Sequence, residues 1–191
     1  MNLSVLKNKN YVLVVLGRFV SSFGTLLQNF ALSLYVLEKT GSALLFSSVI
    51  AVSLIPRFFL MPIAGVITDK FSRKKMIVNM DILSGVFVLA ISVLFLLKGE
   101  LSLGVIYIIV ITLNSINVFF EPSMNSILPD IIEKDKLADA NSLMEMSGAI
   151  ISLTAPIVAG LLYSTLGIYV ILAINAVSFL LSAFSEAFIK I

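Results

Sequence analysis

A short basic segment, residues 65–75, places the strongest constraint on how this chain can fold. It holds four lysines or arginines within six positions, and apolar-rich stretches lie on both sides of it. Each flanking stretch has about the 20 residues that a helix needs to cross the hydrocarbon core of a bilayer. A loop this tight and this basic must lie at a membrane surface, on the cytosolic side. The segment therefore predicts two spanning helices joined inside the cell.

The composition supports a membrane protein and narrows its chemistry. The 191 residues are 59% hydrophobic and 13% charged, whereas soluble domains are about 45–50% apolar and about 25% charged. The sequence contains no Cys and no His, which excludes zinc sites of the usual kind and thiol or imidazole catalysis. A net charge of +2 is too small to indicate nucleic-acid binding. We expect neither an enzyme, nor a metal site, nor a cofactor.

Hydropathy and the polar breaks between apolar stretches predict a single transmembrane domain over residues 1–191 with six helices. No connecting segment is long enough to fold as a soluble domain. The predicted spans are 11–37, 44–68, 76–97, 104–128, 137–164 and 167–188.

The distribution of cations predicts the orientation of these spans. If the N-terminus is cytosolic, the outer loops hold only Lys39 and Lys98. All other loop and terminal cations are then inside, as the positive-inside rule requires. We therefore expect a multi-pass protein of the cell membrane with both termini in the cytosol. The inner cations are Lys7, Lys9, Lys70, Arg73, Lys74, Lys75, Lys134, Lys136 and Lys190.

Two predicted spans carry a similar stripe of polar residues. Positions 18, 22, 25, 29 and 33 of the first span, and 114, 117, 121 and 125 of the fourth, recur at steps of three or four. Each set falls on one helix face, which must look into protein or a watery cavity. Interhelical hydrogen bonding alone would also explain such faces. The matching spacing instead favours a 3+3 inverted repeat, about 1–98 and 99–191, with a cavity lined by Thr25, Asn29, Asn114, Asn117, Glu121 and Phe23.

Arg57 and Glu121 are expected near the middle of the membrane. Each lies about 13–18 Å along its helix from the cytosolic end. A lone charge at that depth costs at least about 2.5–3.5 kcal/mol, so each needs a partner or water. We hypothesise that they face each other or a shared cavity and that Glu121 carries protons. The alternative is a static ion pair that fixes helix packing.

Three other charged residues receive no chemical role from the sequence. Arg18 lies one to two turns inside the first span, from which its side chain can reach the inner surface. Asp81 and Glu186 lie near predicted helix ends.

The basic segment also carries a resemblance to a known family. It is similar to the signature between helices 2 and 3 of the major facilitator superfamily, except that Ser72 stands where a second glycine is usual. The resemblance implies a cytosolic gate, in which Asp69 locks the inner side against another part of the transporter; a simple topological anchor is the alternative. The matching residues are Gly65, Asp69, Lys70, Arg73 and Lys74.

Further stretches resemble the bacterial drug- and macrolide-efflux branch of that superfamily. They include residues 128–130 and 137–143. Residues 155–160 resemble the antiporter motif of helix 5, with alanines at two glycine positions. This motif contributes a small-residue packing face or a kink at Pro156 that shapes a gate. Its residues here are Ala155, Pro156, Ala159 and Gly160.

The resemblance implies a twelve-helix fold of which this chain is the N-terminal half. The implied function is proton-coupled efflux of small amphiphilic molecules by alternating access. The expected partners are the lipid bilayer, a small-molecule substrate, and a missing C-terminal half or a second copy. The alternative is a non-transporting membrane module, or a half-transporter that must dimerise or assemble with a partner.

Overall fold

Long apolar helices make up nearly all of the structure, which is a computed structural model. It describes residues 3–189, apart from the side chains of Leu3 and Asp69. Five helices in this range are long and apolar enough to cross a membrane, and no strand occurs among the described residues. The prediction of an all-α membrane chain is therefore confirmed. The elements are η1 (Leu3–Lys7), α1 (Lys9–Thr40), α2 (Ala43–Lys70), α3 (Arg73–Lys98), α4 (Leu103–Ile131), η2 (Lys134–Lys136) and α5 (Leu137–Ala187).

The helix ends follow from polar caps and glycines in the sequence. The Asn8 side chain accepts hydrogen bonds from the first backbone N–H groups of α1, and Ser42 caps α2 in the same way. Gly41 ends α1 and Gly99 ends α3, both with the left-handed backbone that glycine adopts without strain. Only residues 71 and 72 separate α2 from α3. The basic segment 65–75 is thus mostly helical, and its turn is shorter than expected.

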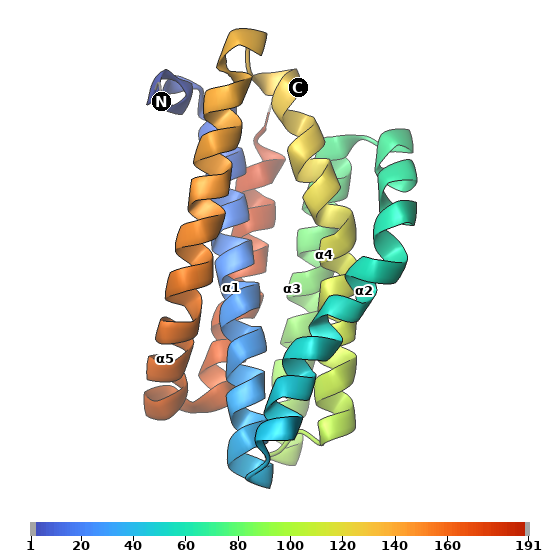
Figure 1. Cartoon of the computed structure of the whole chain (residues 1–191), viewed down its shortest axis with the longest axis vertical. Coiled ribbons are helices and arrows are strands. Elements are labelled where there is room, and N and C mark those ends of the chain that lie inside the picture. The colour runs from blue at the N-terminus through green and yellow to red at the C-terminus, as the bar shows by residue number, and fades with distance from the viewer. Residues whose placement is uncertain (1–2, 190–191) are drawn as a thin grey trace.

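Helix α5 covers the last two predicted spans. It is 51 residues long, and its backbone is non-helical at Gly167, where φ is 74° and ψ is 177°. The chain reverses there, so residues 137–166 and 168–187 form two arms that run in opposite directions (Figure 1). The predicted joint at 164–167 is therefore reduced to a break centred on one glycine. The helix continues through Pro156 without a non-helical residue.

The helices pack in two groups that meet along α3 and α4. Helix α1 packs mainly against α5, and α2 packs mainly against α4. The Tyr11 hydroxyl donates to the Ala140 carbonyl on the first arm of α5, and Asn175 on the second arm donates to Gln28. The turn between α2 and α3, the segment containing η2 and both chain ends lie at one end of the bundle (Figure 1). This end is the one to which the sequence assigns the inner cations.

Helix α2 is the most exposed of the five. Only 11% of its most apolar stretch is buried, against 22–39% for the others. It changes direction near its middle (Figure 1), where Pro56 and Pro62 cannot donate backbone hydrogen bonds. Phe58 and Phe59 lie on its exposed surface. The main apolar core, by contrast, lies among α1, α3, α4 and α5.

Candidate functional site

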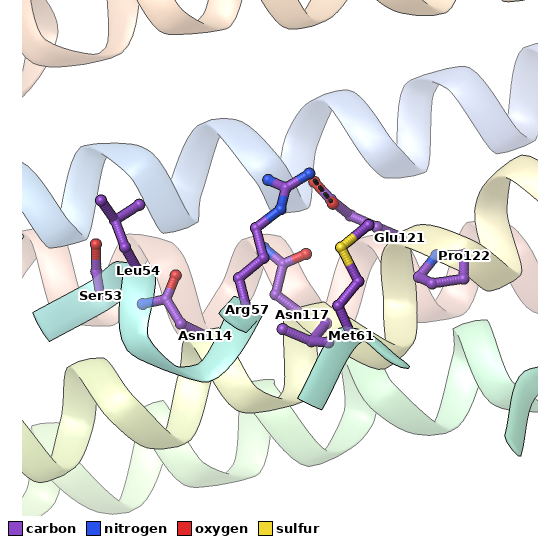
Figure 2. A pocket seen from close by; sticks show the side chains of 9 residues that line it. Ser53, Leu54, Arg57, Met61, Asn114, Asn117, Glu121 and Pro122 are labelled. Carbon is purple, nitrogen blue, oxygen red and sulfur yellow. Dashed lines mark ion pairs between the residues drawn. The ribbon is translucent and has the colours of Figure 1, made fainter. Parts of the chain in front are cut away.

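A groove between α2 and α4 contains the charged residues that the sequence placed near mid-membrane. It forms a cavity of about 90 Å³. Figure 2 shows Arg57 reaching from α2 to Glu121 on α4, with Asn114 and Asn117 beside them. Apolar side chains complete the walls, so the groove combines one ion pair and two amides with hydrocarbon. The full lining is Ser53, Leu54, Arg57, Met61, Asn114, Asn117, Val118, Glu121 and Pro122.

Arg57 and Glu121 form an ion pair across this groove. Arg57 Nη2 lies 3.4 Å from Glu121 Oε2, and the two side chains are 59% and 39% exposed. The attraction offsets part of the cost of holding each charge within the membrane thickness. The pair is therefore accessible from the open side of the groove.

The residues of the polar stripe of α4 lie in two different environments. Asn114 and Asn117 line the groove, and the Asn114 amide donates to the Val110 carbonyl at 2.8 Å. Asn125, one turn beyond Glu121, is exposed on the outside of the bundle. The lining part of α4 is therefore the three residues 114, 117 and 121.

The polar stripe of α1 does not reach this groove. Thr25 is buried and donates to the Ser21 carbonyl at 2.8 Å. Asn29 is partly buried, and its Oδ1 has no partner among the described residues. Phe23 stacks on Phe19 and packs against the main core. Thr25 instead lines a second pocket, which it shares with Asn117 of the groove.

This second pocket lies inside the bundle among α1, α3, α4 and α5. It is a cavity of about 10 Å³, close to the least space that holds one water molecule. Asn117 lines both this pocket and the groove. Its lining is Ser21, Ser22, Thr25, Met80, Asp81, Ser84, Leu113, Ile116, Asn117, Phe120 and Phe179.

Of the three charged residues that received no role from the sequence, two are buried and one is partly buried in the structure. Asp81 is 2% exposed and Glu186 is 0% exposed, although both are close to helix ends. Arg18 is partly buried, and its Nη1 is enclosed without a partner among the described residues. Their position near helix ends therefore does not bring the carboxyls of Asp81 and Glu186 to the membrane surface, because α3 and the second arm of α5 pack in the bundle. Within residues 3–189, no group of three or more acidic, His or Cys residues could hold a metal ion.

The gate motif forms contacts at the cytosol-assigned end of the bundle. Arg73, the first residue of α3, places Nη1 2.6 Å from Asp130 Oδ2 near the end of α4. Lys74 donates to the Ile189 carbonyl at 2.7 Å, just beyond α5. Lys70 is exposed, and the Asp69 side chain lies outside the described part of the structure. Asp130 was not predicted as a partner, although it lies in the stretch 128–130 that resembles efflux proteins.

The helix-5 motif lies in the first arm of α5, and its residues occupy two different environments. Ala155 and Ala159 are fully buried. Pro156 and Gly160 are partly exposed, and a Cβ added at Gly160 would meet nothing within 4 Å. Gly65 of the gate motif has the same open surroundings. The buried alanines fit the packing interpretation, since small side chains let neighbouring helices approach.

Comparison with known proteins identifies a family and several relatives. The family model described as Major Facilitator Superfamily matches residues 14–190. An uncharacterized MFS-type transporter of Bacillus subtilis, YkuC, is 28% identical over 182 residues, which is 94% of this chain and 41% of YkuC. Macrolide efflux protein A of Streptococcus pyogenes is 28% identical over 177 residues, which is 92% of this chain and 43% of that protein. The chain thus spans less than half the length of these relatives.

Proposed function

The chain belongs to the Major Facilitator Superfamily, and we propose that it acts as the N-terminal, six-span half of an exporter of small amphiphilic molecules. In this proposal, the two arms of α5 cross the membrane separately, because each is about as long as a spanning helix and they run in opposite directions. The halves 1–98 and 99–191 are then inverted repeats of three spans each. Both termini lie in the cytosol.

The groove between α2 and α4 is the observation that carries this proposal. Leu54, Met61 and Val118 supply apolar walls, while the amides of Asn114 and Asn117 supply a few fixed polar groups. Such a lining suits a molecule with a large apolar surface and scattered hydrogen-bonding groups. The similarity to Macrolide efflux protein A points to the same class of substrate.

The ion pair provides a way to link transport to protons. Arg57 contacts Glu121 as a carboxylate. Protonation of Glu121 removes its charge, so the pair weakens and Arg57 becomes free to contact substrate or water. In this proposal, Glu121 exchanges a proton for substrate as the groove opens alternately to each side.

The contacts at the inner end supply the gate of this proposed cycle. Arg73 links α3 to α4 through Asp130, and Lys74 links α3 to the chain after α5. Both contacts are polar and near the surface, so they can break and reform as the helices tilt. We propose that Gly65, Asp69, Lys70, Arg73 and Lys74 act together as this cytosolic gate, while the helix-5 motif packs into the apolar core towards the other end of the bundle.

A second six-span unit is required to close the groove. The side of α2 that carries Phe58, Phe59 and Arg57 is exposed. A charged residue facing lipid would be costly, whereas Arg57 could line a transport path between two halves. The partner is a C-terminal half or a second copy of this chain. A membrane module without transport activity is the remaining candidate, because the chain spans less than half of its relatives.

The test is a drug-accumulation assay in bacteria that lack their main exporters. The chain is expressed alone and together with the part of Macrolide efflux protein A that it does not cover. We expect macrolide accumulation to fall in at least one arrangement, and a protonophore to restore it. Light scattering of the purified complex in detergent measures whether the active form contains one or two copies of the chain.

Glu121→Gln and Arg57→Gln are the diagnostic variants, with the exposed Glu145→Gln as a matched control. We expect both groove variants to lose proton-driven efflux and the control to retain it. Unchanged efflux in Glu121→Gln would eliminate Glu121 as the proton carrier. Absence of efflux in every arrangement would favour the non-transporting module.

A further inference from the structure

Two acidic side chains meet inside the bundle, away from the groove. Asp81 comes from the third turn of α3 and Glu186 from the last turn of α5, and both are more than nine-tenths buried. The Ser182 hydroxyl donates to Glu186 Oε1 at 3.2 Å and lies within hydrogen-bonding reach of Asp81. The other oxygens, Asp81 Oδ2 and Glu186 Oε2, have no partner among the described residues.

The backbone of α1 makes room for these carboxyl groups. Gly17 faces Glu186, and a Cβ added at Gly17 would lie 2.6 Å from Glu186 Oε1 and 3.0 Å from Ser182 Oγ. Any other residue at this position would displace the carboxyl. Asp81 in turn lines the small pocket that also contains Thr25 and Asn117. The carboxyl pair is therefore closely packed on the α1 side, with room for about one water molecule beside Asp81.

No cation neutralises the pair in the part of the chain that the structure describes. Charged groups on the surrounding helices include Arg18 on α1, Lys74 on α3, and Glu121 and Asp130 on α4. Lys74 is bonded to the Ile189 carbonyl, and the two α4 carboxylates are paired with arginines of α2 and α3. Arg18 forms no ion pair with Asp81 or Glu186 among the described side chains.

Two neighbouring carboxylates in such a place cannot both be charged. An unpaired buried carboxylate loses its hydration without gaining a partner, and a second negative charge beside it adds repulsion. Taking up a proton from water removes one of the two negative charges. The protonated oxygen then becomes a hydrogen-bond donor, whereas two carboxylates can only accept.

We propose that Asp81 and Glu186 form a buried proton-binding site that holds at least one proton at neutral pH. The proton binds to a carboxylate oxygen, so the pair carries at most one negative charge. This site is separate from Glu121, but Asn117 borders both the pocket of Asp81 and the groove. The existence of the site stands on its own geometry, and its use in proton coupling rests on the exporter function proposed above.

Infrared spectroscopy of the purified chain in lipid tests this proposal directly. A protonated carboxyl group absorbs at a carbonyl frequency that a carboxylate lacks. At neutral pH we expect this band in the wild-type chain and in the exposed-residue control Glu145→Gln. We expect it to shift in Asp81→Asn and in Glu186→Gln, because one carboxyl then remains in changed surroundings. It should be lost when both substitutions are combined.

Several outcomes would overturn the proposal. A wild-type spectrum without the band would mean that both carboxyls are ionised, and a band that survives in the double variant would belong elsewhere. If the double variant does not fold, Ser182→Ala replaces it, because loss of the hydroxyl that donates to Glu186 should move the band. A band unmoved by Ser182→Ala and by both single substitutions would also refute the site. None of these readouts depends on transport, so failure of the exporter proposal leaves them unchanged.

Discussion

The groove between α2 and α4 and the carboxyl site among α1, α3 and α5 use acidic residues in opposite ways. In the groove, Glu121 faces Arg57, and both side chains remain substantially exposed. In the interior, Asp81 and Glu186 face each other and Ser182, and both are buried. The groove is bounded by the sparsely packed helix α2, whereas the interior site lies among the helices that pack most closely.

This difference separates two ways in which a membrane protein can hold a carboxyl group. A carboxylate with a cation beside it can remain ionised and stay accessible to ligands. A carboxyl without a cation must become neutral or be hydrated, so its burial implies a bound proton. Glu121 therefore has the features of an exchange site, and the Asp81–Glu186 pair has the features of a proton store.

Cysteine labelling is expected to give the largest contrast between the two regions. Because the chain contains no native cysteine, only the introduced thiol can react. Ser53→Cys lies in the groove, and Ser84→Cys lies beside Asp81 in the interior pocket. We expect a small hydrophilic thiol reagent to label the first variant in liposomes. The second should remain unlabelled until the protein is denatured, because Ser84 is buried. Equal labelling of both would show that the interior is as open to water as the groove.

Glycine substitution provides the next largest effect. Gly17→Ala places a methyl group against Glu186 and Ser182, and we expect it to lower the free energy of unfolding by about 1–3 kcal/mol, as overpacking does. Gly148→Ala, where a Cβ meets nothing within 4 Å, should instead raise stability by about 0.5–1 kcal/mol. Denaturant titration in mild detergent measures both.

A double substitution tests whether contact with Glu186 causes the loss of stability in Gly17→Ala. Glu186→Ala removes the atoms that Gly17→Ala would strike, so the combined variant should lose less stability than the sum of the two single variants. Simple additivity would contradict a direct clash between position 17 and Glu186.

The pH dependence of the free energy of unfolding is expected to show a smaller difference between the two regions. The folded site holds a proton that the two carboxyls release when unfolding exposes them to water. The folded state then binds more protons than the unfolded state, so stability falls as pH rises, by up to about 1.4 kcal/mol per pH unit for each proton. We expect this slope in the wild-type chain from mildly acidic pH, where the unfolded carboxyls are already ionised, up to neutral pH, and a smaller slope in Asp81→Asn/Glu186→Gln. Glu121→Gln should keep the wild-type slope, and a slope that follows Glu121 instead would reverse the roles of the two regions.

The contact between Arg57 and Glu121 was accessible to sequence reasoning because both residues interrupt strongly apolar stretches. Each charge needed a partner, and depth along the helix placed the two at similar levels. The interior pair gave no such signal. Asp81 and Glu186 lie close to helix ends, where a carboxyl ordinarily reaches water, and nothing in the local pattern shows that α1 covers them at Gly17.

The two polar stripes also show that a local sequence pattern does not reveal which residues a helix face will contact. Periodicity placed Asn114, Asn117 and Glu121 on one face of α4, and in the structure these three residues line the groove. The same periodicity in α1 suggested that its polar face lines the same cavity. In the structure, Thr25 faces the interior pocket and Phe23 packs into the core. A stripe defines a helix face, but the neighbours of that face depend on how the helices are arranged.

The amino-acid sequence by itself determined that the chain is helical, that its helices are long enough to cross a membrane, and where most of them begin and end. Those properties depend on local hydropathy, capping residues and glycines, which act over a few residues. Only the tertiary structure decided that Arg73 meets Asp130 and that Asp81 meets Glu186. These contacts join residues far apart in the chain, and their energies depend on burial and on neighbouring charges that exist only after the helices have packed.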